Sequence, residues 1–135
     1  MKVFLVIDGE PVGKERPRMN SITKRTYTPN KTRDYEELIK WLYQSKVKYR
    51  FTGYIKMTIR CYYSIAKSNS KKVKEQKRNN VLRPSKKPDI DNVIKVVADS
   101  LNGIAYKDDT QIVEVVASKH FSDEPRVEVI LEDIS

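Results

Sequence analysis

Four aspartates are the residues of this sequence whose types and spacing could do chemistry. Asp89 and Asp91 stand one residue apart, and Asp108 and Asp109 form an adjacent pair further along the chain. If the chain is extended at 89–91, both carboxylates leave it on the same side. Mg²⁺ takes a few carboxylate oxygens and keeps several waters. Asp89, Asp91 and one of Asp108 or Asp109 would therefore suffice for a magnesium site, provided that segment 104–110 folds back to them.

A lysine accompanies the first two aspartates. Lys95 shares one face of a predicted helix with Asp91 and Asp99, at steps of four residues, away from the apolar stripe. A bound metal ion lowers the pKa of water and stabilises charge on a phosphodiester during in-line displacement. A nearby lysine can stabilise the developing oxyanion or orient the water. The alternative is structural, because Asp91 and Asn92 can start a helix and Asp108–Asp109 can form a turn.

The elements that must position these residues follow from hydrophobic periodicity. Strands are predicted at 2–7, 53–63, 111–119 and 126–132, and helices at about 32–48 and 91–101, with Asn102-Gly103 as a helix stop. Cys61 belongs to the apolar face of strand 53–63, so we expect it in the core. The order β-α-β-α-β-β favours an α+β fold in two layers, a mixed sheet packed with two helices. The length of 135 residues predicts one domain, 1–135.

The charge of the chain is divided unevenly. Residues 1–87 carry 23 basic and 7 acidic side chains, whereas residues 88–135 carry 4 basic and 11 acidic ones, which together give the net charge of +9. Segment 67–87 has nine Lys/Arg and few apolar residues, which predicts an exposed basic loop in which 71–80 could form a solvated helical turn. A second basic stretch, 14–33, is expected to be irregular, because Pro17 and Pro29 lie within it and Pro11 lies just before it. Such a body favours a polyanionic partner. The candidate DNA-binding residues are Lys14, Arg16, Arg18, Lys71, Lys72, Lys86 and Lys87.

Several classes of protein are disfavoured. No apolar run approaches the roughly 18 residues of a membrane span, so we expect no membrane partner. One cysteine cannot form an internal disulfide and suits a reducing compartment, which predicts a cytoplasmic protein. There is no Gly-rich phosphate loop, CxxC pair or HExxH motif, so we expect no small-molecule cofactor beyond the metal ion. The single histidine, His120, lacks a partner motif for general-base catalysis.

These motifs, taken in order, resemble the RusA-type Holliday junction resolvases. The resemblance rests on Pro-Asp-Ile-Asp-Asn at 88–92 followed by Lys95, on the helix end at Asn102-Gly103, and on Asp108-Asp109. The first part of the chain is similar to the form common in Gram-positive bacteria and their phages. The matching residues there are Gly9, Pro11, Lys14, Arg16, Pro17, Arg18, Tyr27, Thr28, Pro29, Thr32, Tyr35 and Glu36.

The resemblance implies a small homodimeric endonuclease that needs Mg²⁺ and cuts four-way DNA junctions with paired, symmetric nicks. It maps the metal-binding aspartates onto Asp89, Asp91 and the Asp108-Asp109 pair, with Asp109 as the essential member. The functional lysine of the family maps onto Lys95. A two-fold symmetric dimer suits a junction because the junction itself has a two-fold axis. The biological setting that the resemblance suggests is prophage-encoded recombination or DNA repair.

Two other functions stay open from the sequence. A non-catalytic nucleic-acid-binding protein would use the basic segments for phosphate contacts and the aspartates as caps and turns. A metal nuclease with a restriction-type core would need an acid-x-Lys pair on a strand, and segment 114–119 does not supply one at that spacing.

Overall fold

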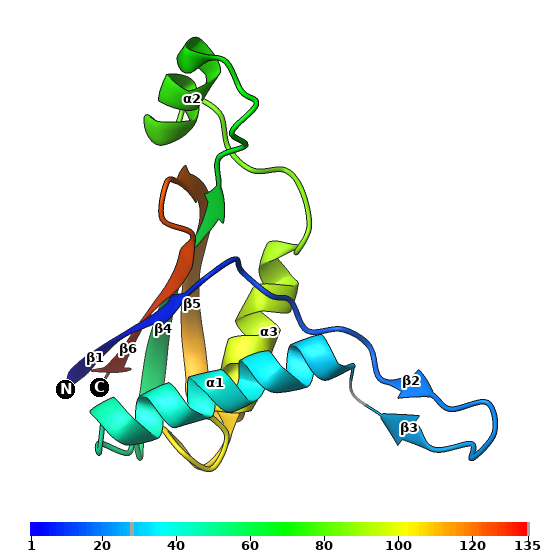
Figure 1. Cartoon of the computed structure of the whole chain (residues 1–135). Helices are drawn as coiled ribbons and strands as arrows, with labels where there is room; N and C mark the ends of the chain where they lie inside the picture. Colours follow the sequence, from blue (N-terminus) through cyan, green and yellow to red (C-terminus); the bar gives the residue numbers. More distant parts are fainter. Residues whose placement is uncertain (28, 135) are drawn as a thin grey trace.

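A four-stranded mixed sheet forms one layer of the protein (Figure 1). This computed structural model describes residues 1–27 and 29–134. The strands are β1 (Lys2–Asp8), β4 (Tyr54–Ser64), β5 (Ile112–Ser122) and β6 (Arg126–Ile134), in the order β1-β6-β4-β5. Strand β6 runs antiparallel to β1 and β4, whereas β5 runs parallel to β4. A parallel pair needs a crossover connection, and the segment between β4 and β5 supplies it.

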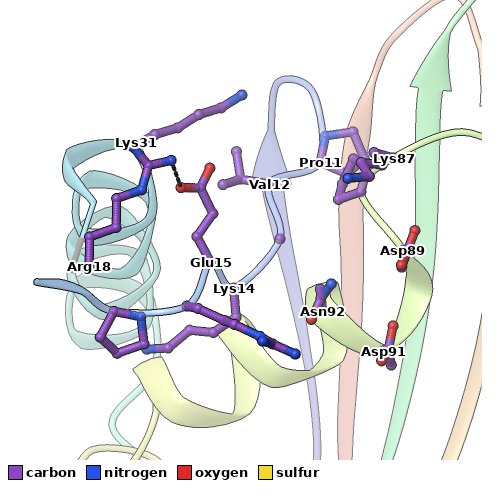
Figure 2. Close-up of a pocket in the computed structure, with 14 residues that line it drawn as sticks. Pro11, Val12, Lys14, Glu15, Arg18, Lys31, Lys87, Asp89, Asp91 and Asn92 are labelled. Atoms are coloured by element: carbon purple, nitrogen blue, oxygen red, sulfur yellow. Dashed lines mark hydrogen bonds and ion pairs between the residues drawn. The ribbon is translucent and has the colours of Figure 1, made fainter.

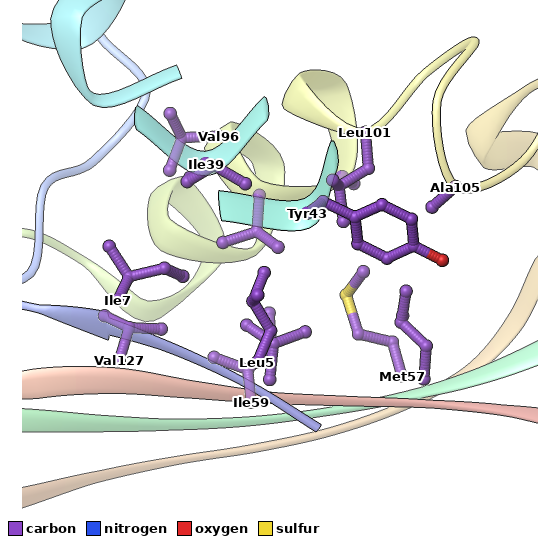
Figure 3. Packing of buried hydrophobic residues seen from close by; sticks show 14 of the residues in the cluster. Leu5, Ile7, Ile39, Tyr43, Met57, Ile59, Val96, Leu101, Ala105 and Val127 are labelled. Atoms are coloured by element: carbon purple, nitrogen blue, oxygen red, sulfur yellow. The ribbon is translucent and has the colours of Figure 1, made fainter. Parts of the chain in front are cut away.

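Two helices form the second layer and cover one face of the sheet. Helix α1 (Asn30–Lys46) buries Tyr35, Ile39 and Tyr43, which repeat at helical spacing. Helix α3 (Ile90–Ser100), part of the crossover, buries Val93, Val96 and Val97. Figure 3 shows Ile39, Tyr43 and Val96 of the helices packed over Leu5, Ile7, Met57, Ile59 and Val127 of the sheet. The predicted α+β class is therefore confirmed.

Alternation along the strands fixes which side chains enter this core. On β4, Ile55, Met57, Ile59, Cys61 and Tyr63 are buried, and the residues between them are only partly covered. Cys61 lies in the core as expected, and burial raises the pKa of its thiol to about 11. The thiol therefore stays protonated and is a packing group at neutral pH.

Both basic segments contain regular structure, where the sequence predicts irregular chain at 14–33 and leaves a solvated helical turn open at 71–80. Strands β2 (Arg18–Met19) and β3 (Thr26–Tyr27) pair antiparallel within the basic stretch 14–33, so the expectation of irregular chain is wrong there. Helix α2 (Lys71–Arg78) lies in the basic segment 67–87 and buries none of its residues. Ser70 caps α2 by accepting a hydrogen bond from the Val73 amide. Figure 1 shows the β2–β3 hairpin and α2 projecting from the two-layer body.

Helix α3 ends where the sequence predicts. Gly103 has a φ of +75°, a conformation that glycine adopts without strain, and its amide donates to the Tyr106 carbonyl at 2.8 Å. The buried Tyr106 hydroxyl then donates to the Ala98 carbonyl at 2.6 Å. These bonds hold segment 101–107 against the C-terminal end of α3. Within the described residues, no helix is long and apolar enough to cross a membrane.

Candidate active site

Segment 11–18 lies against the first turn of α3 and forms one wall of a cleft. The Lys14 amide donates to the Asn92 carbonyl at 2.9 Å. Gly13 permits this approach, because a Cβ on it would lie 2.9 Å from the Pro88 Cβ and 3.0 Å from the Asn92 Cβ. On the other side of the segment, the buried Thr32 hydroxyl of α1 donates to the Gly13 carbonyl at 3.3 Å. The wall is thus held by both helices.

The cleft contains cations and carboxylates together (Figure 2). It occupies about 770 Å³, within the roughly 300–1,000 Å³ of ordinary ligand sites. Five basic side chains line it, with three carboxylates and an amide: Lys14, Arg16, Arg18, Lys31, Lys87, Glu15, Asp89, Asp91 and Asn92. Such a lining can hold a phosphate backbone against the cations and present carboxylate oxygens to it.

Asp89 and Asp91 both stand at the N-terminal end of α3. Asp89 occupies the N-cap position, but its side chain accepts no capping hydrogen bond from the first turn. Asp91 lies in that first turn, and both side chains are exposed. The structural alternative placed the helix start at Asp91 and Asn92, whereas α3 begins at Ile90 with Asp89 as its N-cap, and the Asp89 carboxylate oxygens make no capping bond. Two exposed carboxylates at one helix end, the first of them free of capping bonds, suit a hard divalent cation.

Lys14 joins the two helices by ion pairs. Its Nζ lies 3.2 Å from the Glu36 carboxylate of α1 and 3.5 Å from the Asp99 carboxylate of α3. The side chain is only 19% exposed. These contacts give Lys14 a structural role, and its part in DNA binding stays a prediction. Arg16 and Arg18 are exposed at the same wall, and Arg18 lies 3.4 Å from Glu15.

Asp108 and Asp109 lie at the opposite end of α3. Asp108 caps a short 3₁₀ turn, Asp109–Gln111, by accepting from the Asp109 amide at 3.0 Å. The Asp109 amide also donates to Asn102 Oδ1 at 2.8 Å. Partial burial, then the neighbouring Asp108 carboxylate and then Asp99 raise the pKa of the Asp109 carboxyl. The turn interpretation thus describes Asp108 well, while Asp109 stands in a cluster of like charges.

The expected return of segment 104–110 to the head of α3 does not occur within one chain. Asp91 and Asp99 are eight residues apart, about 12 Å along the helix axis, and Asp109 lies beside Asp99. Among residues 1–27 and 29–134, no three acidic, histidine or cysteine side chains form a group that could hold a metal ion. Lys95, exposed at mid-helix, stands between the two acidic ends.

The other basic candidates lie on α2 and the segment that follows it. Lys71 and Lys72 are exposed on the first turn of α2. The helix is attached to the end of β5, because Lys77 Nζ lies 4.4 Å from the centre of the Phe121 ring. Lys86 is exposed, and Lys87 lines the cleft beside Asp89. The segment thus extends a basic surface from the cleft to α2.

His120 lies outside the cleft, on β5. Its ring stacks on Tyr62 and lies within hydrogen-bond distance of Ser118 Oγ, at 2.7 Å, and of Asn80 Oδ1, at 3.0 Å. Partial burial, then Arg83 and Arg60, lower its pKa below the ordinary value. These contacts are those of a packed surface histidine and give it no access to the carboxylates.

The pH dependence of stability is expected to change in a His120→Gln protein. Because the folded-state pKa of His120 is lowered, its stabilising effect is complete above about pH 7 and is lost as pH falls through about 6.5. Glutamine does not titrate, so the fall in melting temperature between pH 7.5 and 5.5 should be smaller in the variant than in the wild type. Thermal unfolding followed by circular dichroism across this range measures it. An unchanged pH profile would contradict the assignment.

A two-layer α+β body with two carboxylates in a cation-lined cleft suits a protein that holds and processes phosphodiesters. The family model described as endodeoxyribonuclease RusA matches residues 8–132. The chain belongs to the RusA endodeoxyribonuclease family. It is also 39% identical over 138 residues to YqaN, an uncharacterized protein of Bacillus subtilis (strain 168), in a match that covers 98% of this chain and 97% of YqaN.

Membership of this family decides between the alternatives that the sequence left open. The chain is an endodeoxyribonuclease, and the family implies resolution of Holliday junctions. The hypothesis of a non-catalytic nucleic-acid-binding protein is therefore wrong. Binding to branched DNA and use of a divalent metal ion are what such a family implies. Of the residues that carry the resemblance, Thr28 lies outside the described residues.

Proposed function

We propose that this protein is a Mg²⁺-dependent endonuclease that resolves four-way DNA junctions by two symmetric nicks and acts as a homodimer. The observation that carries the proposal is the cleft in which Asp89 and Asp91 stand with unused oxygens among five basic side chains. Carboxylates alone would repel a DNA backbone. The surrounding cations neutralise the phosphates and release their counterions, which favours binding.

The residues fit a magnesium ion through the chemistry of their donors. Asp89 and Asp91 would supply the first carboxylate oxygens, and Asp109 the third. When bound, Mg²⁺ activates water and stabilises the charge of an in-line displacement at phosphorus. Lys95 lies one helical turn beyond Asp91, and its ammonium group would stabilise negative charge that develops on the phosphate. Asp108 is occupied by its capping bonds, which favours Asp109 as the third ligand.

We expect the basic residues to bind DNA at two distances from the cleft. Arg16, Arg18 and Lys87 border the cleft, so we expect them to position the phosphates next to the carboxylates. Lys71, Lys72 and Lys86 lie farther out and would bind the arms of the junction through charge alone. Cytoplasmic location and a prophage setting stay predictions from the sequence.

The third carboxylate requires a second copy of the chain. Within one chain, Asp109 stands at the far end of α3 from Asp89 and Asp91, so the three cannot share one ion. Strand β5 begins just after Asp109 and lies at the edge of the sheet. Val113, Val115 and Val116 on it are 52%, 45% and 53% exposed. An apolar edge strand with free backbone groups is a template for pairing with another chain.

Two-fold pairing of β5 with its copy would bring the two acidic groups together. Arg83 Nε donates to the Lys119 carbonyl at 2.8 Å, which covers the end of β5 and leaves 112–118 for pairing. Antiparallel pairing centred near Val115 sets the partner subunit's Asp109 opposite Phe121. Phe121 pairs with Tyr63 of β4, whose hydroxyl donates to the Pro88 carbonyl next to Asp89. The dimer would thereby complete two metal sites related by its axis.

Cleavage of three DNA substrates by the purified protein tests the proposed function. With Mg²⁺, a four-way junction should give two nicks at symmetric positions, while linear duplex of the same sequence and a flap should remain largely uncut. Chelation by EDTA should stop the reaction, and excess Mg²⁺ should restore it. Nicking of the duplex at the rate of the junction, or full activity in EDTA, would contradict the proposal.

A further inference from the structure

The β2–β3 hairpin is a basic arm with an apolar tip. Residues 16–27 carry four cations and no acid: Arg16, Arg18, Lys24 and Arg25. Met19 and Ile22 are 60% and 88% exposed, so the apolar side chains of this arm are not used in the core. Single exposed apolar residues are common on protein surfaces. Ile22 stands at the end of a projecting arm that carries four cations, so a polyanion is the partner that it would meet.

The tip is held in one conformation by its own hydrogen bonds. Asn20 Oδ1 accepts from the Ile22 amide at 2.9 Å and from the Thr23 amide at 3.1 Å. The Asn20 backbone closes the turn, since its amide donates to the Arg25 carbonyl and its carbonyl accepts from the Lys24 amide, both at 2.8 Å. Lys24 adopts the left-handed conformation, with a φ of +61°. Ile22 is therefore presented outward by an ordered turn.

The base of the arm is part of the cleft. Arg16, Pro17 and Arg18 line it together with Asp89 and Asp91. Ile22 lies four residues beyond Arg18, and because the chain turns at Asn20 its reach is shorter than the roughly 13 Å of four extended residues. Successive nucleotides of one strand are about 3.4 Å apart, so the tip lies within about four base steps of a phosphate held in the cleft. Ile22 would thus contact the same DNA molecule near the point of cutting.

We propose that Ile22 is a wedge that enters the base stack at the branch point of the junction. This inference rests on the proposed function, because it assumes that branched DNA lies in the cleft. Apolar side chains inserted between base steps unstack them, and the cost is lowest where stacking is already interrupted. A branch point offers such a gap and a continuous duplex does not. Ile22 therefore selects the branched substrate, while the cations of the arm bind the phosphates of branched DNA and of continuous duplex alike.

Substitution of Ile22 separates this role from phosphate binding. Ile22→Ser removes the apolar tip without touching the core, and Ile22→Leu keeps it. We expect Ile22→Ser to cut a four-way junction at least about 10-fold more slowly, with an unchanged melting temperature and unchanged affinity for linear duplex. Ile22→Leu should cut at nearly the wild-type rate. In an Asp91→Asn background, 2-aminopurine at the branch point should brighten on binding when residue 22 is Ile or Leu and stay dim when it is Ser.

Two results would overturn the wedge. One is an equal 2-aminopurine signal and equal cutting with Ile or Ser at position 22, in a wild-type protein that does cut junctions. That outcome leaves the proposed function intact. The other is an Ile22→Leu protein as impaired as Ile22→Ser, since apolar character would then not be the property that matters. A wild-type protein that fails to cut junctions at all would instead contradict the proposed function.

Discussion

Asp91→Asn and Asp109→Asn proteins are each expected to lose junction cleavage by about 1,000-fold, and a mixed dimer of the two should recover it. Each substitution removes a metal ligand, and a loss of this size corresponds to about 4 kcal/mol of transition-state stabilisation. Both variants should still bind the junction, because the basic residues of the cleft are unchanged. Initial rates of nicking, measured at saturating protein with labelled junctions, give the comparison.

Recovery in the mixed dimer follows from the division of the site between subunits. In a dimer of one Asp91→Asn and one Asp109→Asn chain, one site carries both substitutions and the other carries none. Such a dimer, purified with two different tags, should nick one of the two strands and produce few paired nicks. If each site came from a single chain, both sites would be damaged and no activity would return.

A matched control uses two substitutions from the same half of the site. A mixed dimer of Asp89→Asn and Asp91→Asn chains has one substitution in each site, so it should stay inactive. Activity in this control, or none in the Asp91→Asn and Asp109→Asn dimer, would contradict the shared site.

The layers of this fold could be predicted because its signals are local. The alternation of Ile55, Met57 and Ile59 on β4 and the spacing of Val93 and Val97 on α3 determine which face each element buries. The closeness of Asp89 and Asp91 in the sequence likewise places both at one end of α3. Each of these inferences needed only a few neighbouring residues.

The position of Asp109 could not be predicted, because it depends on contacts that are distant in sequence. After α3, the chain is held at the C-terminal end of the helix, where the Phe51 amide donates to the Ala105 carbonyl at 2.7 Å and the Tyr106 hydroxyl bonds to Ala98. The aspartate pattern carries no information about this path. The β2–β3 hairpin escaped prediction for a different reason: its strands are two residues long and expose every side chain, so no periodicity marks them.

A Val115→Lys protein is expected to be a monomer that retains its fold and loses junction cleavage by at least about 100-fold. Val115 is 45% exposed on β5, so a lysine there costs the monomer little. In the proposed dimer, Val115 lies near the two-fold axis and meets its own copy, where two lysines would place like charges opposite each other. Light scattering should then give 15.8 kDa for the variant and twice that mass for the wild type.

The other edge of the same sheet supplies the control. Phe4 on β1 is 55% exposed, so Phe4→Lys places the same charge on an equally accessible strand away from the proposed interface. It should remain dimeric and cut junctions at the wild-type rate. A dimeric and active Val115→Lys protein would contradict the β5 interface, because two lysines near the axis cannot be accommodated there. A monomeric protein with full cleavage would show that one chain completes the site, since no second copy would then be present to supply Asp109.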